Sequence, residues 1–246
     1  MTKKATQHSI RSWFDQWYVR KHIKSMRHPS AYPVFLDLLQ VIPGKRLLDI
    51  GCGPGWLLKA AVARGLEAYG FDFSEEAIKL SHQNSPAAHS EVGDVTQIRQ
   101  PDQFFDYITC IGVLEHFLQM DLAIKEMKRV AKREALFCIM VPNSSTLFWK
   151  LSQLFSPGHR ESNENAMTLR EWKTFFTSYQ FHIRAVFRDQ WNIYKFYSLL
   201  GLGNWTALIR GTRRMARKLL PLALSRQFIF IMENNEVSPE GEESHE

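Results

Sequence analysis

Short apolar runs alternate with amphipathic stretches between residues 46 and 142. The apolar runs predict strands at residues 46–50, 68–71, 107–111 and 135–141, and a further short strand that ends near Asp94. The stretches 56–64 and 121–132 carry apolar side chains at helical spacing, the second with Leu122, Met127 and Val130 on one side. Strands that alternate with helices of this length predict βαβ units and a parallel sheet.

Local signals predict where further elements begin. Ser74 is a predicted N-cap for a helix that follows the second strand. Thr168 and Glu171 form a predicted capping box for a helix over residues 169–177. The remaining predicted elements are one or two helices within residues 8–40 and two late strands at residues 181–187 and 227–232.

The composition is that of an ordinary globular chain, with 45% hydrophobic and 23% charged residues among 246. The three cysteines stand alone, without metal-ligand spacing, which favours a reduced chain and gives no metal site: they are Cys52, Cys110 and Cys138. The first residues lack the apolar core of a signal peptide, and the longest apolar run, 135–141, is too short to span a membrane. We therefore expect a cytoplasmic protein.

The net charge of +6 is distributed unevenly. From Arg184 to Arg226 there are nine Lys or Arg and one acidic residue, whereas residues 233–246 hold six Glu and no Lys or Arg. Residues 199–220 predict a helix with one apolar and one basic side. Such a helix can pack on its own domain, or it can make a peripheral contact with the inner face of a membrane. Nucleic acid is disfavoured as a partner, because no RNA-binding motif accompanies the segment.

The sequence LLDIGCGPGWLL, residues 47–58, carries the strongest chemical signal. An apolar strand runs into Gly51, Gly53 and Gly55 and then into a helix, so the backbone can turn tightly and a ligand can approach it closely. A dinucleotide-binding loop has the spacing GxGxxG, but here the last glycine comes one residue early and Trp56 takes its place. This spacing disfavours NAD and FAD.

Three carboxylates lie at the carboxyl ends of three predicted strands, at similar intervals. Asp72 lies 23 residues after Asp49, and Asp94 lies 22 residues after Asp72. A carboxylate at that distance from a glycine loop can accept hydrogen bonds from ribose hydroxyls. In an open α/β sheet the three carboxylates would line the crevice at the carboxyl ends of the strands.

Residues 46–142 resemble the core of class I S-adenosylmethionine-dependent methyltransferases. LLDIGCGPG matches the first motif of that family, GFDFSEEAI resembles the second, and EVGDVTQI resembles the third. FDYITCIGVLEHF resembles the fourth strand and following loop of small-molecule and quinone-type members. The resemblance implies a Rossmann-like α/β fold, with a seven-stranded, mostly parallel sheet, helices on both faces and an antiparallel last strand. It also implies S-adenosylmethionine as the cofactor.

The same resemblance implies roles for individual residues. The loop would hold the methionine part of the cofactor through Gly51, Cys52, Gly53 and Gly55, and Asp49 would orient that loop and the methionine ammonium group. Asp72 and Phe73 would hold the ribose, Asp94 and Val95 would flank the adenine, and the backbone near Ile111 would complete the pocket.

His116 is the best-placed candidate for a general base, since it follows the fourth predicted strand and a histidine can take a hydroxyl proton near neutral pH. The alternative is that Glu115 and His116 brace the loop. His159 and His182 are weaker candidates. Arg20 or Arg27 could clamp the methionine carboxylate, or could belong to a solvated basic face.

The aromatic cluster of the N-terminal segment is open to two interpretations: a lid over the substrate, or a helix packed on the core. Its members are Trp13, Phe14, Trp17 and Tyr18. The sequence after the fourth strand, GVLEH, lacks the Asn/Asp-Pro-Pro-aromatic pattern of enzymes that methylate base amines. The pattern of a cytosine-C5 enzyme, a Pro-Cys nucleophile, is also absent. By subtraction, these absences favour oxygen methylation of a small or lipid-like molecule.

We therefore expect three parts. Residues 1–42 form a helical lid or cap, residues 43–232 form the methyltransferase domain with a basic insert at 195–226, and residues 233–246 form an acidic tail. Two alternative functions remain open: an RNA or protein methyltransferase that docks through residues 199–220, and a cofactor-binding homologue without turnover.

Overall fold

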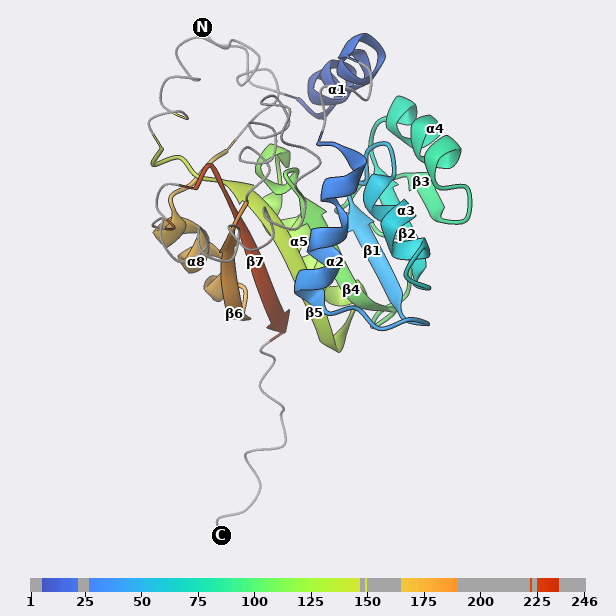
Figure 1. Ribbon diagram of the computed structural model, residues 1–246. Coiled ribbons are helices and arrows are strands. Elements are labelled where there is room, and N and C mark those ends of the chain that lie inside the picture. Colours follow the sequence, from blue (N-terminus) through green and yellow to red (C-terminus); the bar gives the residue numbers. More distant parts are fainter. Residues whose placement is uncertain are drawn as a thin grey trace, which may run out of the picture.

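The computed structural model describes residues 6–21, 27–146, 149, 165–189, 222 and 225–234. Within them lies a seven-stranded sheet in the order β3-β2-β1-β4-β5-β7-β6 (Figure 1). The strands are β1 (Arg46–Ile50), β2 (Glu67–Asp72), β3 (His89–Val92), β4 (Phe105–Ile111), β5 (Ala131–Pro142), β6 (Phe181–Arg188) and β7 (Gln227–Asn234).

The first five strands are parallel, and β7 is antiparallel to both of its neighbours, β5 and β6. This arrangement confirms the seven-stranded, mostly parallel sheet that the sequence predicts. The chain proceeds from β1 outward to β3, then returns to place β4 on the other side of β1. The strand order therefore reverses between β1 and β4, and open α/β sheets bind ligands beside the carboxyl ends of strands at such a point.

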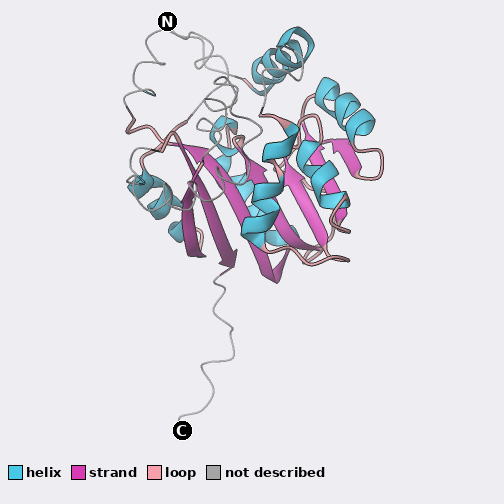
Figure 2. Ribbon diagram, viewed as in Figure 1, coloured by secondary structure: helices cyan, strands magenta, loops and turns pink. Residues whose placement is uncertain are grey.

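Helices cover both faces of the sheet (Figure 2). They are α2 (Pro33–Leu39), α3 (Trp56–Val62), α4 (Glu75–Asn84), α5 (Met120–Val130) and α8 (Leu169–Ser178), in addition to α1 (Gln7–Lys21) at the amino end. Residues of α2, α3 and α4 pack with one cluster of buried side chains, and residues of α5 and α8 pack with the other. The sheet is thus covered on both sides, as its continuous apolar strands predict.

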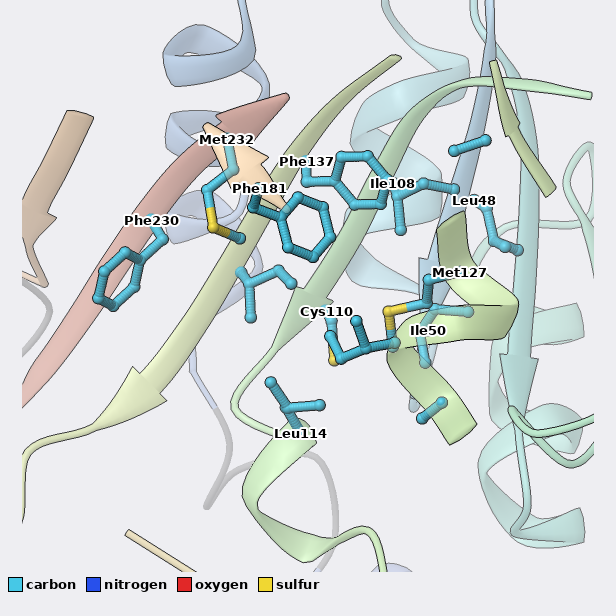
Figure 3. Close-up of a cluster of buried hydrophobic side chains, with 14 of the residues drawn as sticks. Leu48, Ile50, Ile108, Cys110, Leu114, Met127, Phe137, Phe181, Phe230 and Met232 are labelled. Carbon is cyan, nitrogen blue, oxygen red and sulfur yellow. The ribbon is translucent and has the colours of Figure 1, made fainter. Parts of the chain in front are cut away.

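The larger core lies between the sheet and the pair α5 and α8. Figure 3 shows its centre, which includes Met127 of α5 and Ile108 and Cys110 of β4, and where Phe181 lies beside Phe137. The rings of Phe137 and Phe181 are 4.8 Å apart in an edge-to-face arrangement. Because β5 packs with both clusters, its six residues from Phe137 to Pro142 are all buried.

Several predicted boundaries shift. Helix α3 ends at Val62 rather than residue 64, and α5 ends at Val130 because residues 131–132 already belong to β5. Leu122 was expected on the buried side of α5, but it is 40% exposed, and Ala123 and Ile124 are buried with Met127 instead. Met127 and Val130, the other two residues of the predicted side, are fully buried, so only the position of Leu122 was wrong.

The last strand runs to Asn234, so the predicted acidic tail begins two residues too early: Glu233 pairs with Arg184 inside the sheet. The rest of that tail and residues 199–220 lie outside the described residues. Within the described part of the chain, no helix has the length and apolar character required to cross a bilayer.

Helix α8 begins at the predicted capping box. The Thr168 hydroxyl accepts from the Glu171 N–H, and the Glu171 carboxylate accepts from the Thr168 N–H. One turn later, Trp172 is fully buried, and its indole N–H donates to the Pro142 carbonyl at 2.9 Å. This bond fixes the distance between α8 and the end of β5.

We expect Trp172→Phe to lower the free energy of unfolding by about 1–3 kcal/mol, because the buried Pro142 carbonyl loses its donor. The adjacent Lys173→Ala, on the exposed side of α8, should change it by less than about 0.5 kcal/mol. Urea unfolding of both variants and the wild type measures the difference, and equal effects of the two substitutions would contradict this account.

Candidate functional site

A cavity of about 270 Å³ lies at the carboxyl ends of β1, β2, β3 and β4. Its walls come from the segments that follow these four strands, and one side of α1 closes it. The strands meet there at the reversal of strand order, so four loops far apart in the sequence surround one space.

Asp72, at the end of β2, is the central polar group of the cavity wall. It is 5% exposed, and its two carboxylate oxygens accept from the Gly53 N–H at 2.9 Å and the Ser74 N–H at 3.0 Å. Burial raises the pKa of the Asp72 carboxyl to about 6, although the hydrogen bonds from Ser74 and Gly53 lower it. A carboxylate offers about four acceptor positions, so these two bonds leave room for hydroxyl donors.

The glycine loop packs against its surroundings too closely for side chains. Gly51 has φ +67°, and a Cβ there would lie 2.6 Å from the Val113 side chain. A Cβ on Gly55, φ +77°, would lie 2.6 Å from the Ser81 hydroxyl. Cys52 lies against Gly70 of β2, within the core cluster of α2 and α3, so only its backbone is available to a ligand.

Asp49 lies below the loop, in β1, and does not line the cavity. Its carboxylate is 4% exposed and accepts from the Thr109 hydroxyl of the adjacent β4 at 2.7 Å. Burial raises the pKa of the Asp49 carboxyl to about 7, against the opposing effect of the Thr109 hydrogen bond. A cationic group placed over the loop would lower the pKa of Asp49 and so favour its ionised form.

Asp94 and Val95 form the wall after β3. One Asp94 oxygen accepts from the Thr96 N–H at 2.9 Å and from the Thr96 hydroxyl at 2.8 Å. These bonds fold the segment into an Asx turn, and Val95 within it lines the cavity.

Helix α1 covers the cavity with Ile10, Phe14 and Tyr18. Phe14 bridges two sides of the cavity, with its ring 5.4 Å from that of Phe73 and 5.3 Å from that of His116. The helix is held down by a hydrogen bond of 2.5 Å between the Ser74 hydroxyl and Asp15, and by the ion pair of Arg11 with Glu75 at 2.7 Å. The side of α1 that carries Phe14 thus acts as a cover, as one interpretation of the aromatic cluster expects.

His116 follows β4 in the short helix η3 (Leu114–His116) and lines the cavity. Its neighbour Glu115 points into the protein, with only 2% of its surface exposed, and the Glu115 carbonyl accepts from the Asn165 N–H at 2.8 Å. Glu115 therefore braces the loop, whereas the His116 side chain faces the space where a ligand would bind.

The other candidates lie elsewhere. Arg27 is neither a clamp at the cavity nor part of a solvated face: its guanidinium binds both oxygens of Asp189 at 2.8 Å, with 10% of the side chain exposed. His182 is an exposed residue of β6 at the far side of the sheet. His159 and the Arg20 side chain lie outside the described residues.

Comparisons with known proteins now bear on this geometry. The family model described as "Methyltransferase domain" matches residues 26–191. A demethylmenaquinone methyltransferase of Geobacillus kaustophilus is 34% identical over 137 residues, which cover 51% of this chain and 57% of the relative. A ubiquinone biosynthesis O-methyltransferase of Hahella chejuensis is 30% identical over 103 residues, or 40% of this chain and 43% of the relative.

A solved structure shows the same fold at lower identity. It is a TehB-like SAM-dependent methyltransferase of Corynebacterium glutamicum, with a TM-score of 0.58 and 16% identity over 94% of this chain and all of that one. The family match spans well over half of the sequence. The chain belongs to the methyltransferase domain family.

This methyltransferase domain is of the class I, S-adenosylmethionine-dependent type, as the sequence motifs predict. It spans about half the length of the relatives that it matches in sequence. Among the described residues, no group of three His, Cys, Asp or Glu side chains is arranged to hold a metal ion.

Of the predicted site residues of the methyltransferase domain, six line the cavity: Gly51, Asp72, Phe73, Asp94, Val95 and His116. The other five are not part of the cavity lining: Asp49, Cys52, Gly53, Gly55 and Ile111. Val113, rather than Ile111, forms the wall after β4 because the chain turns at Gly112, φ +69°.

Sequence reasoning missed the way in which α1 takes part. Ile10, Phe14 and Tyr18 recur every four residues, which places them on one side of a helix. That spacing was a usable signal, but Arg11 and Asp15 interleave with it, and the helix has a weak apolar side overall. Only the contacts with Ser74 and Glu75 show which side faces the domain.

We expect Asp49→Asn to stabilise the ligand-free domain increasingly as pH rises from about 4 to about 7. The folded-state pKa of Asp49 lies above the ordinary value of 3.8, so the folded chain holds its proton longer and loses stability over that range. The gain should approach about 1.4 kcal/mol for each unit of pKa shift. Urea unfolding at pH 4.5 and pH 8 measures it.

Asp106→Asn is the control of opposite sign. Burial raises the Asp106 pKa, but the Arg46 N–H and the Lys132 ammonium outweigh it, so the pKa is lowered overall. This variant should lose stability relative to the wild type as pH rises. Parallel curves of unfolding free energy against pH for Asp49→Asn and the wild type would contradict this account. They would mean that folding does not raise the pKa of Asp49.

Proposed function

We propose that this domain binds S-adenosylmethionine in the cavity below α1 and transfers its methyl group to an oxygen of a small or lipid-like acceptor. The observation that carries the proposal is Asp72, a buried carboxylate at the cavity wall whose two oxygens are oriented by backbone N–H groups on either side. Such a group is preorganised to accept hydrogen bonds from a diol.

The walls fit the parts of this cofactor. Asp72 holds the ribose hydroxyls beside Phe73, and Asp94 and Val95 flank the adenine. The backbone of Gly51–Gly55 lies against the methionine part, and Asp49 attracts its ammonium group from beneath the loop. The cavity volume of about 270 Å³ lies just below the range of about 300–1,000 Å³ that is usual for small-molecule sites, and α1 with Phe14 closes over this space.

When bound, the cofactor supplies a methyl group on a positively charged sulfonium, and the protein must align a nucleophile with it and exclude water. Helix α1 excludes water, since Phe14 lies over the space between Phe73 and His116. His116 accepts the proton of the acceptor hydroxyl at one of its ring nitrogens. Its side chain is the described histidine that faces the cavity.

The acceptor class is inferred from the relatives and the walls. Demethylmenaquinone and ubiquinone-biosynthesis enzymes take their names from lipid-like quinones. Ile10, Phe117 and Leu118 line the same cavity as His116, and an aromatic or lipid-like molecule would fit against their apolar side chains.

What residues 199–220 bind would determine where the enzyme acts and which of the alternative acceptors it methylates. If they contact anionic lipid, the enzyme acts as a peripheral protein at the inner face of a membrane. If they dock RNA or another protein, the acceptor belongs to that partner. A methyl-transfer assay distinguishes both from a cofactor-binding homologue without turnover, which would give no labelled product.

We expect Asp72→Asn to weaken binding of S-adenosylhomocysteine at least about tenfold, because a bond to an ionised group contributes about 1.5–3 kcal/mol. Calorimetry at pH 7.5 measures it, and Glu76→Gln, in the first turn of α4 and away from the cavity, is the matched control. Wild-type affinity should also fall as pH drops below about 6, the pKa of Asp72. Unchanged affinity in the variant and across pH would sink the proposed cofactor role.

We expect His116→Gln to lower the rate of methyl transfer by about 10²–10⁴-fold, the usual contribution of a general base, while S-adenosylhomocysteine affinity stays within about twofold. The assay follows a labelled methyl group into cell extract separated into lipid, small-molecule, RNA and protein fractions. Wild-type label should enter the lipid or small-molecule fraction. Label in RNA or protein would favour docking through residues 199–220, and no label with intact cofactor binding would indicate a domain without turnover.

A further inference from the structure

A second hollow, which we call the basic groove, lies at the sheet edge opposite the cofactor cavity. It has a volume of about 470 Å³ and is formed by the end of α5, the start of β5, the end of α8 and the end of β7. These strand ends are the amino ends of the parallel strands, so the groove cannot share a ligand with the cavity below α1 (Figure 1).

Four cations line the basic groove: Lys125, Lys128, Arg129 and Arg133, against a single carboxylate, Asp102. Two of the four are already engaged. Arg129 pairs with Glu126 at 2.8 Å and with Asp102 at 2.5 Å, and the Lys128 ammonium donates to the Tyr179 carbonyl at 2.8 Å. Both also lie at the end of α5, where cations stabilise the helix dipole. Their presence has a structural explanation.

Lys125 and Arg133 have no such explanation. Both are exposed, and among the described residues neither side chain forms an ion pair or a hydrogen bond. Lys125 lies before the last turn of α5, and Arg133 lies on the first residues of β5, so the fold uses neither for a cap. They give the groove two uncompensated positive charges from two different elements.

The chain itself supplies a ligand of opposite charge at this place. Asn234, the last residue of β7, lines the basic groove. The twelve residues that follow, NEVSPEGEESHE, contain five Glu and no Lys or Arg. Glu236 is two residues beyond Asn234, within about 7 Å of it along an extended chain. A tethered segment of this kind competes at an effective concentration of about the millimolar range.

We propose that residues 235–246 dock in the basic groove, with their glutamates on Lys125 and Arg133. The docked segment neutralises the groove and denies it to outside polyanions, a relevant protection in a chain of net charge +6. It also covers the open ends of α5 and α8 without reaching the cavity that holds Asp72.

Zero-length carbodiimide coupling of the full-length chain tests this, because it joins an amine to a carboxylate only in contact. Peptide mapping should find Lys125 joined to Glu236, Glu240 or Glu242, and these products should fall at least fivefold in Arg133→Glu, which adds no amine. They should also fall at least fivefold in 1 M salt, where the screening length is about 3 Å. Lys59, exposed on α3 at the other face of the sheet, is the internal control.

A second measurement does not depend on coupling chemistry. A labelled peptide of residues 235–246 should bind full-length chain whose five tail glutamates are changed to Gln at least about tenfold more tightly than wild type, since the tethered copy no longer competes. Adding Lys125→Glu and Arg133→Glu should abolish this binding, and adding Lys59→Glu should not.

Several outcomes would overturn the proposal. Coupling of Lys59 as often as Lys125, or no change with Arg133→Glu, would mean non-specific contact. Products that join light to heavy chains in an isotope mixture would assign the groove to a second copy. Equal peptide affinity for the wild type and the chain with five Glu→Gln changes would mean that the tethered segment does not occupy the groove. An outside polyanion would then be the expected ligand.

Discussion

The buried carboxylate of Asp72 is the interaction on which the site depends. It is placed by β2 but bonds to the backbone of Gly53 in the loop after β1 and of Ser74 at the start of α4. One side chain therefore fixes two loops relative to each other at the carboxyl edge of the sheet. Burial also raises the pKa of this carboxyl to about 6. A ligand that donates hydroxyl hydrogen bonds or carries a positive charge would therefore stabilise its ionised form.

The surrounding residues make sense as consequences of that placement. Because Gly53 must approach Asp72, the loop passes close to Val113 and Ser81, and glycine is required at Gly51 and Gly55. Gly70, in the middle of β2, makes room for the Cys52 thiol and the Leu58 side chain. Ser74 caps α4 and also bonds to Asp15, so the cover helix α1 is attached to the same corner as the carboxylate.

The cavity and the basic groove, at opposite edges of the sheet, have opposite electrostatic character. Carboxylates gather at the carboxyl edge, where Asp72 and Asp94 line the cavity and Asp49 lies beneath the glycine loop. Cations gather at the other edge, in the basic groove around Lys125 and Arg133. Arg27 and Asp189 neutralise each other beside the start of β7, which pairs with the last residue of β5, so this buried ion pair also lies at the carboxyl edge. A basic chain can in this way keep an acidic cofactor site.

The sequence by itself determined the alternation of strands and helices, the caps at Ser74 and Thr168, and the carboxylates after the strands, because these depend on neighbours within a few residues. The resemblance extended this to the antiparallel last strand and the cofactor. Tertiary structure alone decided that Phe14 covers the cavity, that Val113 replaces Ile111 in its wall, and that Arg27 serves Asp189. Each of these depends on which side of a helix or strand packs against a segment that is distant in the sequence. The spacing of neighbouring residues does not determine the free energy of such packing.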